Sequence, residues 1–204
     1  MPLEDHVGDI CRKARIQTDT PMAAAAETAG VEELVLDAWE TDGDSAARVN
    51  VGALAELLGL DVKKAISVAD GWEPSPVDLS LWSSLRMITT AGSFEVNSFV
   101  IWDSATLEAA MFDTGWFVDD IVQLAEAEKL KVQHLFITHM HGDHVAAIGE
   151  VRKQWPAIQL HTNNSGAPEK NRVREGEALA VGDLWVTPRF TPGHAEDGVT
   201  YLIE

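Results

Sequence analysis

The sequence predicts an α+β protein, with a small all-α bundle over residues 1–74 followed by a partial αββα sandwich over residues 75–204. Three observations predict this organisation. The first 74 residues place apolar side chains at helical spacing between capping residues. Pro74 and Pro76 then interrupt the chain and indicate a linker over residues 72–77. Beyond the linker, strand-like and helix-like runs alternate, which is typical of helices packed on a layered sheet.

Four stretches of the first domain carry helix signals. Thr20 is expected to cap a helix that begins at Pro21 and ends at Gly30. The next helix follows at once, because apolar residues recur at i, i+3, i+4, i+7 and i+8. They are Val31, Leu34, Val35, Ala38 and Trp39. Further helices are predicted over residues 51–58, closed by Gly59, and from an Asp61 cap through Ala69.

The helices over 21–30 and 31–40 are joined by a tight turn, and this layout resembles a helix-turn-helix domain of the phage-repressor type. The second helix would occupy the recognition position, yet it carries four acids and no lysine or arginine. Residues 1–74 hold 15 acids and 6 bases, a net charge of 6 − 15 = −9. Because phosphate neutralisation drives even non-specific DNA affinity, we expect nucleic acid to be an unlikely partner. Instead, this domain is expected to serve in docking or homo-oligomerisation, or to pack beside the active site.

The second domain opens with strands and then alternates. Residues 85–90 and 93–100 predict paired strands. Later runs predict a helix, a buried strand and a short helix. These cover residues 117–129, 132–137 and 145–151. His134 lies inside the buried strand and is expected to be a core residue.

The segment from Thr138 to His144 concentrates metal-binding side chains. It contains His139, His141, Asp143 and His144, and His194 follows fifty residues later in Thr-Pro-Gly-His. The first two histidines are two residues apart, so an extended chain projects both to one side, while Gly142 lets the backbone fold back. Imidazole nitrogens and a carboxylate suit zinc, non-haem iron or manganese. The pattern therefore predicts a metal site.

The H-x-H-x-D-H and T-P-G-H phrases, with an Asp113-Thr-Gly turn upstream, resemble the metallo-β-lactamase superfamily over roughly residues 80–204, in particular its glyoxalase II-like branch. The resemblance implies that residues 97–102 and 109–115 form the strand pair before the motif, and that a strand over 199–203 follows the loop of the third histidine. It implies that His139, His141 and His194 hold one metal. It implies that Asp143 and His144 begin a second site, completed by a bridging aspartate and one more histidine. It also implies that Asp113 hydrogen-bonds a metal-binding histidine, and that a complete domain binds one or two zinc ions, with iron or manganese as alternatives.

The residues after His194 depart from that pattern. No histidine follows, and the later acids, Glu196, Asp197 and Glu204, stand in a different context. The expectation is that the domain is C-terminally incomplete, that this chain binds at most one metal tightly and that its turnover is weak or absent. Its three imidazoles with an open position suffice for a catalytic zinc.

Three functional hypotheses follow. The first is a metal-dependent hydrolase in which Asp143 lies beside an activated water and the substrate is a small-molecule thioester or ester, such as hydroxyacylglutathione. The second is an iron-dependent persulfide dioxygenase. The third is a non-enzymatic metal-binding regulator that acts through the helix-turn-helix-like domain. Lys170, Arg172 and Arg174 either face an anionic substrate or lie in a solvated loop.

Composition sets outer limits. A formal net charge of −18 argues against nucleic acids and anionic membranes as partners. Cys11 is the single cysteine, so no internal disulfide is available, and no signal-like or membrane-spanning apolar run is present. These features predict a cytoplasmic protein.

Overall fold

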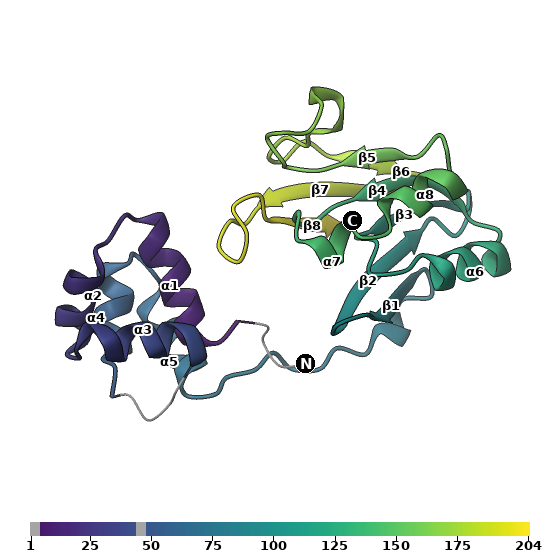
Figure 1. Ribbon diagram of the computed structural model, residues 1–204. Helices are drawn as coiled ribbons and strands as arrows, with labels where there is room; N and C mark the ends of the chain where they lie inside the picture. The colour runs from purple at the N-terminus through teal and green to yellow at the C-terminus, as the bar shows by residue number, and fades with distance from the viewer. Residues whose placement is uncertain (1–4, 44–47) are drawn as a thin grey trace. The chain divides into compact units, whose positions relative to one another are not determined.

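The structure, a computed structural model, describes residues 5–43 and 48–204. It contains two compact units, Met1–Val77 and Asp78–Glu204 (Figure 1). The predicted boundary after residue 74 lies three residues before this division, within residues 72–78, which form neither helix nor strand. Each unit has its own hydrophobic core.

The first unit is a bundle of short helices. They are α1 (Val7–Gln17), α2 (Met22–Ala29), α3 (Glu33–Asp42), α4 (Val51–Leu57) and α5 (Val62–Ala69). Small side chains of α2, including Ala25 and Ala29, pack against Leu36, Trp39 and Leu54 in the core. The Asp61 cap is confirmed, because its carboxylate accepts the backbone N–H of Lys64 at 3.1 Å.

Two predictions in this unit are wrong. Thr20 does not cap α2, because Pro21 is still extended, with ψ 144°, and the helix begins at Met22. The buried face of α3 is also different from the predicted one. Leu36, Trp39 and Glu40 are buried, whereas Leu34 is 81% exposed.

A buried ion pair explains the orientation of α3. The Glu40 side chain is fully buried, and its carboxylate accepts hydrogen bonds from the Arg15 guanidinium of α1, the shortest at 2.8 Å. A buried carboxylate is costly unless it is paired, so the α1–α3 contact requires Glu40 to face inward. The helix is therefore turned so that Leu34 and Val35 face outward.

The outward face of α3 is acidic. Glu33 and Asp37 are exposed on it. Two expectations for this unit stay predictions. One is that nucleic acid is not a partner, and the other is that the protein associates with itself through this unit. Within residues 5–43 and 48–204, no helix combines the length and apolar character needed to cross a membrane.

The second unit is built on two sheets. The larger has the order β1-β2-β3-β4-β5, antiparallel from β1 to β3 and parallel from β3 to β5. Its strands are β1 (Leu85–Ala91), β2 (Glu95–Trp102), β3 (Glu108–Phe112), β4 (Lys131–Phe136) and β5 (Gln159–His161). The smaller sheet is antiparallel and consists of β6 (Leu179–Val181), β7 (Leu184–Phe190) and β8 (Val199–Ile203).

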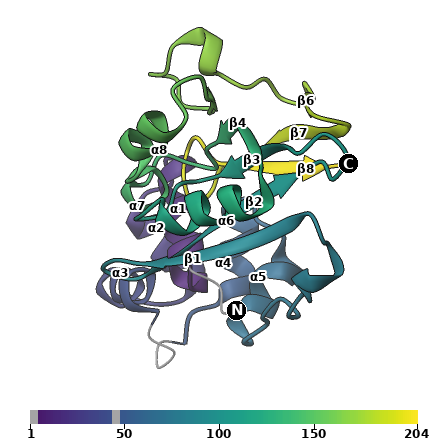
Figure 2. The same cartoon turned by 90° about the vertical axis from the view of Figure 1, so that its right-hand side faces the viewer.

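Alternating side chains of β3 and β4 bury both faces of the larger sheet. Met111 and Leu135 pack in one core with α6 (Asp119–Glu128) and α8 (Ile148–Gln154). Phe112 and Phe136 belong to the other core, which includes residues of the smaller sheet. Figure 2 shows α6 and α8 on one side of β3 and β4, with β7 and β8 on the other. The predicted fold class, α+β with a helical N-terminal part, is confirmed.

The helix predicted over residues 145–151 is in fact two short helices, α7 (Gly142–Val145) and α8. Thr114 separates them. Its backbone N–H donates to the carbonyl of His144 at 2.9 Å, and its hydroxyl accepts the backbone N–H of Ala147 at 3.0 Å. Because these backbone groups bond to Thr114, a continuous helix cannot form, and the histidine segment is fixed against the turn that follows β3.

Candidate metal centre

Three histidines from two distant parts of the chain meet at one end of the two sheets. His139 follows β4, His141 immediately precedes α7, and His194 lies in the loop between β7 and β8. The smaller sheet is joined to the motif where β8 begins, because the backbone N–H of Val199 donates to the carbonyl of Thr138 at 2.8 Å. This junction brings a loop fifty residues away to the histidine segment.

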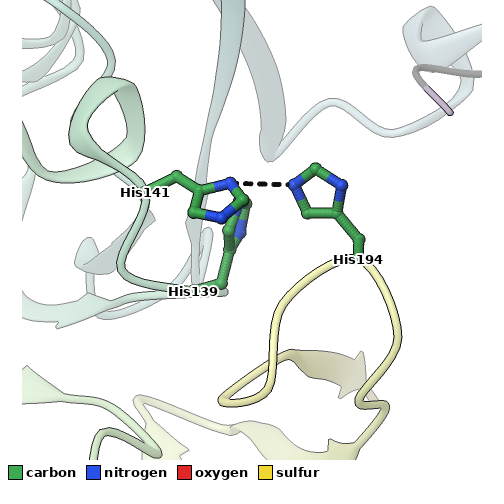
Figure 3. A group of neighbouring side chains, drawn as sticks. All are labelled: His139, His141 and His194. Atoms are coloured by element: carbon green, nitrogen blue, oxygen red, sulfur yellow. Dashed lines mark hydrogen bonds between the residues drawn. The ribbon is translucent and has the colours of Figure 1, made fainter. Parts of the chain in front are cut away.

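The imidazole nitrogens of this histidine cluster (His139, His141 and His194) point toward one another (Figure 3). Nδ1 of His141 lies 3.1 Å from Nε2 of His139 and 3.0 Å from Nε2 of His194. One ring nitrogen from each histidine lies within 4.8 Å of the others. The sequence-predicted ligands of site one are therefore placed together.

The spacing of these nitrogens fits a tetrahedral cation. With metal–nitrogen bonds of roughly 2.0–2.1 Å, two ligands of a tetrahedral zinc lie about 3.3 Å apart. The two short nitrogen–nitrogen distances, 3.1 and 3.0 Å, are close to that value. The donor set, three imidazoles at an accessible position, suits zinc or iron.

Asp113 connects the turn after β3 to the histidine segment. Its carboxylate is buried and accepts three hydrogen bonds: from the backbone N–H of Thr138 at 2.7 Å, from the Thr138 hydroxyl at 2.7 Å and from Nδ1 of His144 at 2.8 Å. The backbone at Asp113 has φ +58°, a left-handed conformation that aspartate tolerates better than most residues. The hydrogen bond expected between Asp113 and a histidine of the motif is thus present.

These hydrogen bonds set the tautomers of two histidines. A carboxylate only accepts, so His144 donates from Nδ1, and in the neutral ring the lone pair is on Nε2. The Thr138 hydroxyl has one proton, which it gives to Asp113, so its contact of 2.9 Å with Nδ1 of His139 requires that nitrogen to donate. The lone pair of His139 is then on Nε2, the nitrogen that faces the cluster.

Electrostatics favour the metal-binding form of His139. Its pKa is lowered from 6.5 to about 4, mainly by burial and in addition by the neighbouring His144, His141 and His194, against an opposing effect of Asp113. The ring is consequently neutral at physiological pH. A neutral imidazole is the form that binds a metal ion.

Asp143 and His144 lie beside the cluster. The His139 and His144 rings are 4.0 Å apart between centroids, and the carboxylate of Asp143 is 3.3 Å from Nε2 of His144. Nε2 is the His144 nitrogen that carries the lone pair. The two predicted ligands of a second site are adjacent, and their binding of a metal stays a prediction.

A cavity of about 480 Å³ opens next to His141 and His194. Its other walls are Met140, Asn163, Asn164, Ser165, Ala195, Glu196 and Asp197. Lys170, Arg172 and Arg174 do not line it. Lys170 lines a separate groove beside Arg152, and Arg174 lies 3.7 Å from Glu177. The solvated-loop interpretation fits these three cations.

His134 and His161 form a second histidine pair, inside the sheet core. Nδ1 of His134 is 3.0 Å from Nε2 of His161, both rings are buried, and both stack on Phe136. Burial, and secondarily His134, lowers the pKa of His161 to about 4. His134 is the core residue predicted, and neither ring lines the cavity of the metal centre.

The family of this chain follows from its sequence match. The sequence profile of the metallo-beta-lactamase superfamily matches residues 91–202, slightly more than half of the chain, including all the histidines of the cluster. The protein belongs to the metallo-beta-lactamase superfamily. Members of this superfamily bind metal ions and are hydrolases or related enzymes, so the resemblance inferred from the motifs is confirmed.

Relatives of this superfamily member include two curated proteins and one solved structure. A lactamase-like protein of Pestalotiopsis microspora is 25% identical over 165 residues, covering 78% of this chain and 50% of that protein. A hydroxyacylglutathione hydrolase of Rhodopseudomonas palustris is 32% identical over 110 residues, covering 52% and 42%. The structure of ETHE1 from Myxococcus xanthus shows 31% identity with a TM-score of 0.53, covering 58% and 53%. The chain thus spans about half, or less, of the length of these relatives.

Two threonines of this superfamily member have roles that the sequence did not reveal. Thr114 anchors the segment between α7 and α8, and Thr138 passes the hydrogen bond of Asp113 on to His139. The sequence could have indicated these two threonines only by their position, because each follows the end of a strand within a motif. Threonine at a strand end has many other uses, so the pattern did not single them out.

Proposed function

We propose that residues 78–204 form the metal-binding part of a hydrolase that uses zinc to cleave a small-molecule thioester or related ester. The observation that carries this proposal is the convergence of three imidazole nitrogens at the wall of an open cavity. Three protein ligands with an accessible fourth position are typical of catalytic rather than structural zinc.

The bound cation and the residues of the chain would have different roles in the reaction. A bound divalent cation supplies Lewis acidity, which lowers the pKa of coordinated water toward about 7 and polarises an ester carbonyl. The chain's residues hold the ligands in their binding tautomers: the proton of His139 is held at Nδ1 by Thr138, and that of His144 at Nδ1 by Asp113. We assign Asp143, which is adjacent to Nε2 of His144, as the carboxylate that accepts a proton beside the cluster.

The relatives support a thioester as the substrate. The match to a hydroxyacylglutathione hydrolase covers 52% of this chain, and the superfamily match includes all three histidines. Because the chain spans 42% of that enzyme, the activity and the substrate of the whole protein are part of the proposal.

The likeness to ETHE1 of Myxococcus xanthus favours a second candidate, an iron-dependent persulfide dioxygenase. A single site of three histidines is compatible with this chemistry, since imidazole ligands also suit iron. The two candidates differ in metal and in co-reactant, which makes them separable by experiment.

The test begins with metal analysis of the purified chain, followed by assays of the zinc-loaded and iron-loaded protein. Hydrolysis of S-lactoylglutathione by the zinc form, abolished in His141→Ala and His194→Ala but retained in His6→Ala, is the expected result. Oxygen consumption with glutathione persulfide by the iron form, without thioester hydrolysis, would replace the first candidate by the second. Inactivity of both loaded forms in both assays would refute the hydrolase proposal for this chain.

A further inference from the structure

The cavity beside the histidine cluster is lined by polar residues of two loops to which the proposed chemistry assigns no role. The loop after β5 contributes Asn163, Asn164 and Ser165, and the loop between β7 and β8 contributes Glu196 and Asp197 immediately after the histidine loop. A molecule whose reacting bond lies at His141 and His194 would extend between these loops, because the same cavity includes both.

Asn164 fixes the relative position of the two loops. Its side-chain oxygen accepts the backbone N–H of Gly166 at 2.8 Å, which orients the amide. Its amide nitrogen then donates to one carboxylate oxygen of Asp197 at 3.4 Å. Asn164 is therefore a positioning residue that holds the Asp197 carboxylate against the wall of the cavity.

The charge at this wall is uncompensated. Among the described residues, the Glu196 side chain has no hydrogen bond or ion pair, and Asp197 bonds only to the neutral amide of Asn164. The lining residues include neither lysine nor arginine. Two negative charges thus lie at this wall within a chain of net charge −18, and they attract a cationic substituent. A divalent cation at the histidine cluster offsets part of this potential at the other end of the cavity.

We propose that this wall is a subsite for a cationic group of the substrate, an ammonium group next to the ester or thioester that is cleaved. The inference rests on the proposed hydrolase function and narrows its substrate class. Glu196 and Asp197 provide the charge, and Asn163 and Ser165 offer neutral hydrogen-bonding groups at the same wall.

The test compares thioesters that differ only in charge, using the zinc-loaded chain. One series is acetylthiocholine, its neutral isostere 3,3-dimethylbutyl thioacetate, and S-acetyl-3-mercaptopropionate. A second series carries the same charges on the acyl side of the thioester instead of the thiol side. Together the two series test binding with either side of the thioester against the wall. The expected result in at least one series is a kcat/KM roughly tenfold higher for the cation than for the neutral isostere, given the modest strength of exposed ion pairs. The anion should be poorer still.

Variants test whether Glu196 and Asp197 cause the preference for the cationic substrate. Glu196→Gln combined with Asp197→Asn removes both charges and keeps an oxygen that accepts from Asn164, so the cation should lose its advantage. Glu126→Gln combined with Glu128→Gln on α6 changes the net charge equally at exposed positions elsewhere and should leave the preference intact. The preference should also weaken at high ionic strength, because salt screens exposed charges.

Binding measurements give a readout that does not depend on turnover. Calorimetry of the zinc-loaded chain should show thiocholine binding roughly tenfold more tightly than 3-mercaptopropionate, and the Glu196/Asp197 double variant should remove this difference. Hydrolysis without a charge preference in either series would overturn the subsite while leaving the hydrolase intact. Absence of all hydrolysis would overturn the hydrolase, and the order of thiol binding would then decide the subsite. A preference that persists in the double variant would also refute it.

Discussion

Replacement of Asp113 by asparagine should weaken zinc binding by roughly 10- to 100-fold, the usual effect of removing a residue that orients a metal ligand. That range corresponds to about 1.4–2.7 kcal/mol of binding free energy. Asparagine has nearly the same shape and also tolerates φ +58°, so the backbone of the turn is retained. The change therefore acts mainly through hydrogen bonding.

The effect can be followed atom by atom. The asparagine oxygen must stay opposite the backbone N–H of Thr138, so the new NH₂ group takes the place of Oδ2, where it meets the donors of Thr138 and His144. His144 must then move its proton to Nε2. The Thr138 hydroxyl must turn its proton toward Nδ1 of His139, which moves the proton of that ring to Nε2. Both histidines would present an N–H instead of a lone pair.

Competition for Zn²⁺ with a chromophoric chelator measures the affinity, and circular dichroism checks the fold. Asp120→Asn, at an exposed position in the first turn of α6, is the matched control and should bind zinc normally. Thr138→Val removes the hydroxyl that bonds both Asp113 and His139 but keeps the hydrogen bond from His144 to Asp113, so it should cause an intermediate loss. Thr138→Ser keeps the hydroxyl and should be nearly neutral. Unchanged zinc affinity in a folded Asp113→Asn protein would show that the carboxylate does not orient the ligands.

Three further predictions concern stoichiometry, pH and packing. Zinc titration should give one tight equivalent per chain, lost in His194→Ala; two tight equivalents would contradict a single three-histidine site. His161 has a folded pKa of about 4 against 6.5 unfolded, so its stability contribution is complete above pH 6.5 and is lost as the pH falls toward 4. From this group alone, urea denaturation should give an unfolding free energy lower by about 2 kcal/mol at pH 5 than at pH 7, a difference that His161→Gln should reduce. Gly115→Ala should destabilise the fold by roughly 2 kcal/mol or more, because φ is +61° and the new Cβ would collide with the Thr90 hydroxyl; an unchanged melting temperature would refute this.

The superfamily and most of the site-one geometry were predictable because the relevant signals are local. His139, His141, Asp143 and His144 lie within six residues, and chain geometry alone keeps them close. Strand and helix patterns also located β1, β4 and α6 to within a few residues of their bounds, and the family resemblance located β8. Such patterns report which side chains are apolar, and that is sufficient to place an element in a layered fold.

Apart from the Thr20 cap, which fails because the adjacent Pro21 is extended, the failures share a physical cause: a partner distant in sequence determined the outcome. α3 buries Glu40 instead of Leu34 because Arg15 of another helix pairs with the carboxylate. The predicted helix over 145–151 is divided because Thr114, thirty residues upstream, bonds to its backbone. Neither effect has a signature in the local pattern of apolar residues.

By itself, the sequence determined the ligand types, their spacing and the layered fold, because these depend on residue chemistry and on the periodicity of short segments. Only the tertiary structure decided which nitrogen of His139 faces the cluster, how the loop of His194 reaches it, and that Glu196 and Asp197 form a wall of the adjoining cavity. These features depend on hydrogen bonds and contacts between segments more than fifty residues apart, such as the 53 residues between His141 and His194. Such contacts form only when the two sheets pack together.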